Sequence, residues 1–440
     1  MEKKWEEMTW QEKREKRFEK WISPPGVKFK DKETEEAYKE RVNRIIKVIK
    51  LEEPDRVPCI PPSGFQAYNA GTDLKTTMYD SSELKRASLK FLREFDMDVF
   101  SSGFTMPGKI MEKLGDRSFF WPGHGLPDDA MMIQFNEQEF MKEDEYDAMI
   151  NDPSDYILRS YIPRATESLE AFSKLPAPYT MVRGAMPFVA AFTNPEIRKS
   201  FQTLIEVSND LMEWGAVAAE IEQTAISEGY PSFGIGGAGP PFDSISDGLR
   251  GVRGIVRDMF RQPEKLIEAM ERILPLEIDM AIAAGNASIS PVLMIPIHKG
   301  DDSFMSDEQF ERFYWPTFRK LLVAMVNEGL VPYPFAEGRY SNRLKTIKDL
   351  PPTGVMWLFD QTDMVRAKKE LGDISCIAGN VPASLMITGT PEQVKEHCRK
   401  LIYDCAPGGG YILTGGAGIH RGNPENIRTM MAATYEYGRY

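Results

Sequence analysis

PVLMIPIHKGDD, at residues 291–302, contains the pattern that decides the fold: a short apolar run that ends abruptly in charged and glycine residues. The same pattern returns in VPYPFAEGR at residues 331–339 and in VMWLFD at residues 355–360. A parallel strand is apolar along its whole length because helices cover both faces of its sheet. Since a longer amphipathic stretch follows each run, the sequence predicts βα units around a parallel sheet.

Working outward from these runs gives nine candidate strands and several helix starts. The candidate strands are 57–60, 98–101, 179–184, 232–236, 292–298, 331–335, 355–359, 374–378 and 411–414. Helix starts are marked by Ser306 with Gln309, by Thr390 with Gln393, and by Asn423 before a proline. The alternation predicts an α/β fold, a (β/α)₈ TIM barrel, with one of the nine candidates outside it and residues 131–135 as an excursion.

Residues 1–50 differ from the rest of the chain. They are rich in Glu and Lys, with Trp5, Trp10, Phe18 and Trp21 interspersed, which predicts helices whose aromatic side chains dock on a surface. That surface is either the chain's own barrel or a twin subunit, so a homodimer is one of two alternatives. We therefore divide the chain into an N-terminal helical extension, 1–50, and a barrel, 51–440.

Composition excludes several classes of partner. The formal charge of −12 and a pI near 5.2 argue against nucleic acid, because binding phosphates needs a local surplus of Lys and Arg. No run of 18 apolar residues occurs, which argues against a membrane span, and the charged N-terminal stretch offers no secretion signal. Four cysteines without a disulfide or zinc spacing fit a reducing compartment, so we expect a cytoplasmic protein.

Polar residues follow the strands of the C-terminal half at the point where each strand ends. They are His298, Glu337, Asp360, Asn380 and His420. Because parallel neighbours end at the same edge of a barrel, we expect these five side chains to gather at one rim. Burial at such a rim would perturb their pKa values, as in an active site.

Each of these residues also has a structural interpretation. Asp360 is a good N-cap for the following helix, and Asn380 beside a glycine suits a turn. His298 can cap its strand, and His420 lies far enough along its loop to be on the surface. The glycine-rich stretch at 234–241 lacks a P-loop ending, so we interpret it as a tight barrel loop.

Four further residues are candidates for substrate binding. Arg183 lies within an apparent strand, where a guanidinium needs an anionic partner, either a structural carboxylate or an acid group of the substrate. Asp302, Arg339 and Tyr340 lie in the loops after two strands, where Arg339 suits a carboxylate and Tyr340 a planar ligand.

The C-terminal third resembles a known family in the order and spacing of its segments. These are PFAEG (334–338), LFDQTDM (358–364), IAGNVP (377–382), GTPEQV (389–394) and NPENI (423–427). They resemble the uroporphyrinogen-decarboxylase (URO-D) superfamily, over roughly residues 50–440. The resemblance implies a (β/α)₈ barrel whose cleft, at the carboxyl ends of the strands, receives a tetrapyrrole or a methyl donor.

Departures from the family pattern indicate the branch. RVPCIPPSGFQAYNAG (56–71) lacks the arginine-rich segment that holds the substrate of true uroporphyrinogen decarboxylases. FAEG (335–338) and Ala417 replace the His and Cys residues of the branch that binds zinc for a thiol substrate. What remains resembles methyltransferases that pass a methyl group from a small donor, such as an aryl methyl ether, to a corrinoid (cobalamin) on a partner protein.

The resemblance and the rim residues together give roles to the candidates. Glu337, kept protonated, would act as an acid towards the leaving oxygen, with His298 and Asp360 beside it. His298 and Glu337, with one of Asp301, Asp302 or Asp360, also suit a divalent metal, zinc among them. Two alternatives stay open: a decarboxylase of another acid, held by Arg183 or Arg339, and a tetrapyrrole-binding protein without chemistry.

Overall fold

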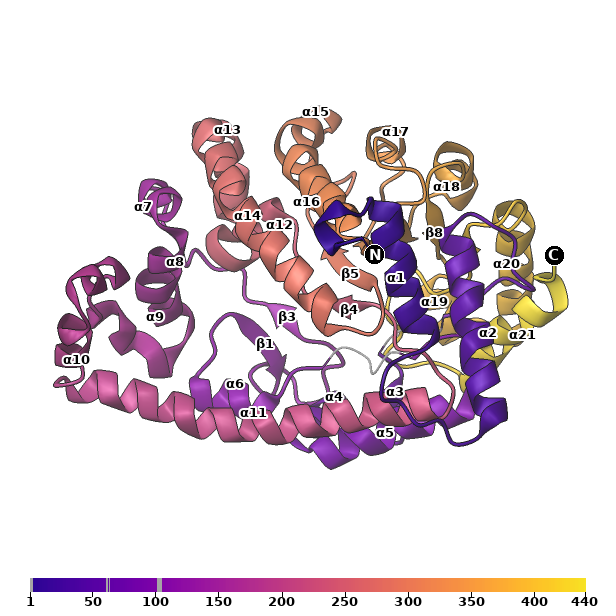
Figure 1. Ribbon diagram of the computed structural model, residues 1–440, viewed down its shortest axis with the longest axis horizontal. Helices are drawn as coiled ribbons and strands as arrows, with labels where there is room; N and C mark the ends of the chain where they lie inside the picture. Colours follow the sequence, from indigo (N-terminus) through magenta and orange to yellow (C-terminus); the bar gives the residue numbers. More distant parts are fainter. Residues whose placement is uncertain (1–2, 61, 63, 101–104) are drawn as a thin grey trace.

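The computed structural model describes residues 3–60, 62, 64–100 and 105–440 (Figure 1). Its strands are β1 (Phe119–Pro122), β2 (Gly125–Leu126), β3 (Gln134–Phe135), β4 (Ile235–Gly236), β5 (Val292–Ile297), β6 (Val331–Ala336), β7 (Met356–Phe359), β8 (Cys376–Ala378) and β9 (Tyr411–Ile412). Its helices are η1 (Trp5–Glu7), α1 (Trp10–Ile22), α2 (Lys32–Ile49), α3 (Gln66–Asn69), α4 (Leu74–Tyr79), α5 (Ser81–Glu94), α6 (Gly108–Leu114), α7 (Tyr146–Asn151), α8 (Pro153–Tyr156), η2 (Ile157–Tyr161), α9 (Ile162–Ala165), η3 (Glu167–Lys174), η4 (Pro178–Arg183), α10 (Met186–Ala191), α11 (Pro195–Ser227), α12 (Pro241–Ile245), η5 (Ser246–Arg250), α13 (Gly251–Arg261), α14 (Pro263–Ala287), α15 (Asp307–Gln309), η6 (Phe310–Tyr314), α16 (Trp315–Asn327), α17 (Leu344–Ile347), α18 (Met364–Leu371), α19 (Ala383–Thr388), α20 (Pro391–Cys405) and α21 (Pro424–Tyr437).

A six-stranded parallel sheet forms the centre of the molecule. Its strands pair in sequence order, β4 to β9, and every neighbouring pair is parallel. Helices follow the strands and cover the sheet, so β7 and β8 are buried along their whole length. The predicted α/β fold with a parallel sheet is confirmed.

Two further candidate strands pair through isolated bridges. Cys59 forms a parallel bridge with Leu413, just beyond β9, and its carbonyl accepts the N–H of Asp98 at 3.2 Å. Phe100 forms a parallel bridge with Ser232, just before β4. Both stretches thus run parallel to the sheet, although residue 101 of the second candidate lies outside the described residues.

The strand predicted at residues 179–184 is wrong. These residues form the 3₁₀ helix η4, which begins at Pro178, and Arg183 is exposed at its end. Proline fixes the backbone for the first position of a helix, and the stretch has neither a covering layer nor a neighbouring strand to pair with. The excursion expected at 131–135 contains β3, which pairs with β1 in a separate three-stranded sheet.

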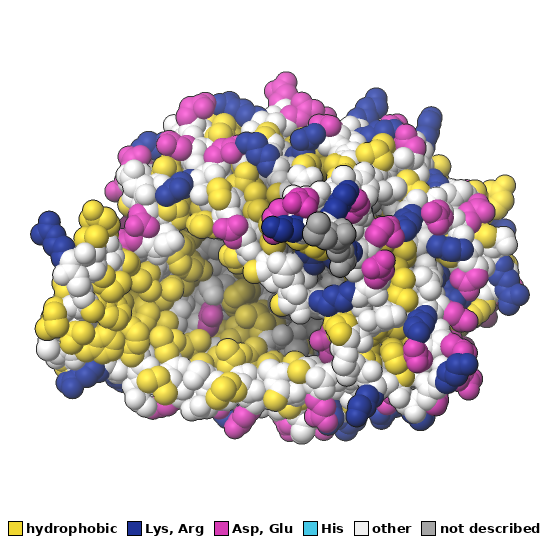
Figure 2. Space-filling model, viewed as in Figure 1, with side chains coloured by type: hydrophobic (Ala, Val, Ile, Leu, Met, Phe, Trp, Pro, Cys, Tyr) yellow, Lys and Arg dark blue, Asp and Glu magenta, His cyan; other side chains and the backbone are white. Residues whose placement is uncertain are grey.

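Beyond the sheet, the chain forms a lobe on the long helix α11. Figure 1 shows α7 to α10 at one end of α11 and the sheet towards the other, with β1 and β3 drawn between them. Figure 2 shows a hollow in this region, whose walls carry many apolar side chains. Within the described part of the chain, no helix is both long and apolar enough to cross a membrane.

The N-terminal helices dock on the chain itself. Phe18 and Trp21 of α1 are 1% and 0% exposed. Arg14, 3% exposed, donates hydrogen bonds to the carbonyls of Leu330 and Gly354, which precede β6 and β7. This helix therefore closes the amino-terminal end of the sheet, opposite the predicted rim.

We expect Arg14→Met to destabilise the protein, because it leaves buried carbonyls without their charged donor. The loss should be about 2–4 kcal/mol in free energy of unfolding, measured by urea denaturation. Gln11→Met, on an exposed position of the same helix, is the control and should change stability little. Equal stability of the two variants would contradict the role of Arg14.

Candidate active site

The strand register brings four of the predicted rim residues to one level. Ile297 lies opposite Ala336, and Ala336 opposite Phe359, so the next residues, His298, Glu337 and Asp360, stand side by side. The pairing of Leu358 with Ala378 places Asn380 level with Asp360. The carboxyl ends of four consecutive parallel strands thus form one polar row.

His298 is held between two carboxylates. Its Nδ1 lies 2.6 Å from Oδ2 of Asp247, and its Nε2 lies 3.7 Å from Oε1 of Glu337. The Asp247 side chain is 6% exposed, that of His298 23% and that of Glu337 45%. Asp247 therefore orients the ring from the protein side, and Nε2 faces the accessible side.

A second buried carboxylate fixes the backbone beneath the ring. Asp243 accepts the N–H groups of His298 and Lys299 at 2.8 and 3.2 Å and the hydroxyl of Tyr314 at 2.8 Å. Lys299 in turn lies 3.1 Å from Asp247 and 2.8 Å from Glu137. The loop after β5 is thus tied to α12 and η5, which carry Asp243 and Asp247.

This arrangement favours the protonated forms of His298 and Glu337. Burial alone would lower the pKa of His298, but the hydrogen bond to Asp247 and the charges of Asp243, Asp247 and Glu337 raise it to about 9. Burial, with the charges of Asp360 and Asp247, raises the pKa of Glu337, against the opposing effect of His298. Burial also opposes ionisation of Asp247, yet the bonds from His298 and Lys299 hold the pKa of Asp247 below its usual value.

The site can therefore donate protons at neutral pH. The His298 imidazolium donates its Nδ1–H in a hydrogen bond to Asp247. Its Nε2–H is therefore left to bind a substrate at the rim. Glu337, beside it, is a carboxyl group that favours the acid form more than usual. Such a pair suits the protonation of an oxygen that gains negative charge during a reaction.

The Asp360 side chain bonds to the loop after β6 and does not cap the following helix. Its Oδ2 accepts the N–H of Gly338 at 3.2 Å, and the N-cap of α18 is Asp363. Asn380 donates to the carbonyl of Thr362 at 2.7 Å, which steadies the loop after β7.

Three predicted substrate-binding residues take part in the packing of the neighbouring loops. Asp302 accepts the N–H of Asn342 at 3.1 Å, and its own N–H donates to the carbonyl of Arg339 at 2.7 Å. Tyr340 is 0% exposed, with its hydroxyl 3.5 Å from the carbonyl of Ile297. The Arg339 side chain is exposed. A contact of these residues with substrate stays a prediction.

The remaining two predicted residues lie apart from the row. His420 packs against Gly64, where an added Cβ would lie 2.6 Å from the His420 Nδ1 atom, and burial lowers the pKa of His420. Arg183 lies on η4, just before α10, which Figure 1 shows at the opposite end of α11 from α5. The strand that was predicted to direct the Arg183 guanidinium inwards does not form.

Sequence reasoning missed the residues that support His298 from elsewhere in the chain. Asp243 and Asp247 are four apart on consecutive helical turns, directly after the glycine-rich loop, and this i, i+4 acidic pair was the available signal. Glu137 reaches Lys299 across 162 positions of sequence, and Phe135 contacts the His298 ring from the small sheet. For these two, the sequence carries no periodic signal.

The donor set fits a metal poorly. Over residues 3–60, 62, 64–100 and 105–440, no three His, Cys, Asp or Glu side chains are grouped to hold an ion. Nδ1 of His298 already binds Asp247, which leaves Nε2 and Glu337 as donors, whereas zinc takes at least three protein ligands. Each candidate for the third ligand already accepts a backbone N–H: Asp301 from Arg339, Asp302 from Asn342 and Asp360 from Gly338. We therefore derive no step through a metal.

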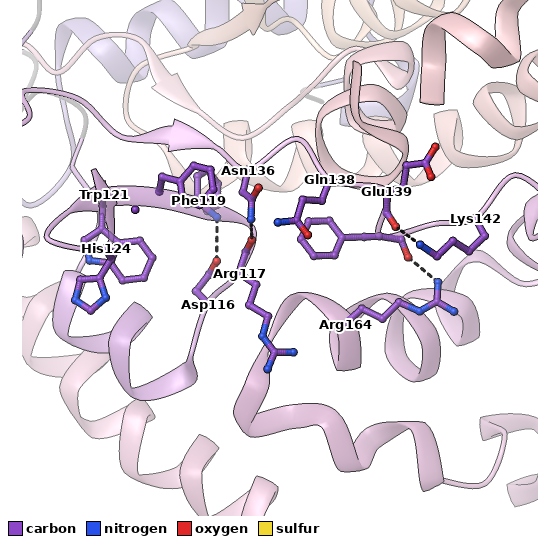
Figure 3. A pocket seen from close by; sticks show the side chains of 13 residues that line it. Asp116, Arg117, Phe119, Trp121, His124, Asn136, Gln138, Glu139, Lys142 and Arg164 are labelled. Carbon is purple, nitrogen blue, oxygen red and sulfur yellow. Dashed lines mark hydrogen bonds between the residues drawn. The ribbon is translucent and has the colours of Figure 1, made fainter. Parts of the chain in front are cut away.

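A separate cavity of about 590 Å³ lies on the small sheet (Figure 3). Its cations are already engaged: Arg117 pairs with Glu170 at 2.8 Å, and Arg164 with Glu145 at 2.6 Å. Lys142 points to the carbonyl of Glu139, 3.1 Å away. With both arginines paired to carboxylates, this cavity is a weaker candidate for chemistry than the rim.

The protonation of His298 is directly testable by NMR, because the chain has only four histidines. We expect the Cε1–H signal of His298 to titrate near pH 9, while burial makes His397 and His420 titrate below the usual 6.5. In Asp247→Asn, burial should dominate and the pKa of His298 should fall well below 9. A wild-type pKa at or below 6.5 would contradict the arrangement.

The raised pKa of His298 also predicts how the free energy of unfolding changes with pH. The folded-state pKa of about 9 exceeds the unfolded value of 6.5, so protonation of His298 adds stability that is complete below pH 6.5. That contribution is lost as the pH rises through about 9, and Asp247→Asn should remove this slope from the curve of unfolding free energy against pH.

The proteins that are similar to this chain include a decarboxylase and a methyltransferase. A uroporphyrinogen decarboxylase from Pseudoalteromonas translucida is 23% identical in an alignment of 214 residues that covers 46% of this chain and 58% of that protein. The chain thus matches less than two thirds of this relative's length. The solved structure of a methyltransferase from Methanosarcina mazei superposes with a TM-score of 0.60 at 16% identity, over 91% of this chain and 98% of the other.

A family comparison covers the larger part of the chain. Residues 176–437 match the model of the family described as uroporphyrinogen decarboxylase (URO-D). This stretch includes β4 to β9 and every residue of the polar row, whereas residues 105–175, with the small sheet, lie outside it. The resemblance seen in the sequence is confirmed, and the chain belongs to the uroporphyrinogen decarboxylase family.

Proposed function

We propose that this protein is a methyltransferase that moves a methyl group from a small donor, such as an aryl methyl ether, to a corrinoid carried by a partner protein. The observation that carries the proposal is the position of His298, held by buried Asp247 and facing Glu337 at the carboxyl ends of β5 and β6. These contacts raise the pKa of His298 to about 9, which favours its protonated form at neutral pH. Family membership and the fold shared with a solved methyltransferase support it.

The rim supplies what demethylation of an ether requires. A phenolate is a poor leaving group unless its oxygen is protonated as the carbon–oxygen bond breaks. Nε2–H of His298 gives that proton, so the donor leaves as a phenol with a new O–H bond. The bound corrinoid would supply the cobalt centre that accepts the methyl group.

Glu337 completes the proton path. After His298 has given up its proton, the neutral ring lies 3.7 Å from a carboxyl group whose pKa is raised by burial. Glu337 can then return a proton to Nε2, and its exposed half lets it recover one from solvent. Asp247 keeps the ring oriented throughout, because its own bonds to Lys299 and Ser246 do not depend on the charge of His298.

The shape of the molecule supports access for a large planar group. Figure 2 shows an open hollow with apolar walls, which suits a macrocycle presented on a partner surface. We further propose that the parallel bridges of Cys59 with Leu413 and of Phe100 with Ser232 join residues 57–60 and 98–100 to β4–β9 as a (β/α)₈ barrel. The four cysteines are free thiols, in keeping with our proposal of a cytoplasmic location.

A decarboxylase acting on another acid is the second candidate, favoured by the similarity to a uroporphyrinogen decarboxylase from Pseudoalteromonas translucida. It needs a cation for the carboxylate, and Arg339 is the exposed arginine next to the row. Carbon dioxide release that is lost in Arg339→Gln would support it.

The methyltransferase proposal is tested by mixing the purified protein with a reduced corrinoid and a panel of methyl donors. The absorbance of methylated corrinoid should grow with an aryl methyl ether and produce one phenol for each methyl group. Tight corrinoid binding without turnover of any donor would instead indicate a tetrapyrrole-binding protein and would overturn the proposal.

We expect Glu337→Gln to lower kcat by about 10²–10⁴-fold, because the amide cannot return a proton to His298. Glu308→Gln, an exposed change on α15, is the matched control and should retain the wild-type rate. Metal analysis of both preparations tests the zinc predicted on His298 and Glu337. An unchanged kcat in Glu337→Gln would exclude the proposed proton path.

A further inference from the structure

The segment at residues 134–142, here called the strap, runs from the small sheet to the rim. It begins with β3 and lies outside the stretch that matches the family. Along an extended chain, alternate side chains point to opposite sides. Accordingly, Phe135 and Glu137 reach the rim, whereas Asn136 and Gln138 line the cavity of Figure 3.

Three contacts fix the strap on the elements that carry the proton site. Glu137 forms an ion pair with Lys299 at 2.8 Å, directly beside His298. The N–H of Met141 donates to the carbonyl of Leu249, on η5, at 2.8 Å. A Cβ added to Gly251 would lie 2.4 Å from the carbonyl oxygen of Glu137, so the backbones meet closely there. The position of the strap relative to Asp247 and His298 is therefore well defined.

Phe135 brings an aromatic ring to the proton donor. Its centroid lies 5.8 Å from that of the His298 ring, with the planes at 62°, and 4.7 Å from that of Phe119. Phe119 thus supports the ring from the small sheet. Phe135 is nevertheless 43% exposed, so its contacts with Phe119 and His298 leave part of the residue accessible.

We propose that Phe135 is a specificity-determining residue that receives the aromatic ring of the methyl donor. This inference rests on the proposed function and deepens it: the donor class is an aryl methyl ether because its ring packs on Phe135 while its oxygen meets Nε2 of His298. Aromatic pairs prefer offset or edge-on contacts, which a ring already supported by Phe119 can offer without rearrangement. The strap lies outside the stretch that matches the family, so this selectivity would come from residues that the family model does not cover.

The test separates ring recognition from methyl transfer by using two matched probes, phenol and cyclohexanol. Binding is followed by the shift of the His298 Cε1–H NMR signal in the wild type, in Phe135→Leu and in Phe260→Leu. Leucine keeps an apolar side chain and removes the ring, and Phe260 is a 72% exposed residue of α13 that serves as control.

We expect phenol to bind the wild type and to bind Phe135→Leu about 2–12-fold more weakly, the factor for 0.5–1.5 kcal/mol of aromatic pairing. Cyclohexanol should bind both proteins equally, and Phe260→Leu should behave as the wild type. Absence of phenol binding to the wild type, or equal phenol affinity in Phe135→Leu, would overturn the inference.

The corrinoid assay distinguishes this failure from failure of the proposed function. If the wild type demethylates aryl ethers and Phe135→Leu keeps the same KM, the inference fails and the function stands. If no donor methylates the corrinoid but phenol binding still depends on Phe135, the aromatic site stands and the function fails.

Discussion

The hydrogen bond between Nδ1 of His298 and Asp247 joins two parts of the chain on which the site depends. Asp247 is nearly inaccessible, and a buried carboxylate is costly unless it is paired and hydrogen-bonded. His298, Lys299 and Ser246 meet that requirement together, so the loop after β5 and helix η5 hold each other in place. The charge that stabilises this junction is the same charge that makes His298 an acid at neutral pH.

The two ends of the sheet have different tasks. At the amino-terminal end, Arg14 satisfies backbone carbonyls and is itself buried, which is a contribution to stability. At the carboxyl end, Glu337 and His298 keep part of their surface accessible although burial disfavours their charged forms. This division follows the general behaviour of parallel βα folds, in which the carboxyl end carries the chemistry.

The sequence predicted the sheet and its polar row because both follow from local pattern. Apolar runs such as 331–336 favour buried strands, and the residue after each strand lies at the edge of the sheet, which places Glu337 and Asp360 there. Residues 179–184 misled the prediction because an apolar run that starts at a proline looks the same in a strand and in an exposed 3₁₀ helix. The sequence did not predict the roles of Asp247 and Phe135, because these roles arise from contacts with His298 across 51 and 163 positions. A local pattern of apolar and polar residues carries no sign of such distant contacts.

The docking of α1 also sets an order of events during synthesis. Arg14 finds its acceptors 316 and 340 positions further along the chain, at Leu330 and Gly354. At a translation rate of about 5–20 residues per second, the ribosome needs roughly 20–70 seconds to make those acceptors after it has made the helix. For that time the apolar face of α1, with Phe18 and Trp21, has no completed sheet end to cover it, so this helix completes its native contacts long after it has been made.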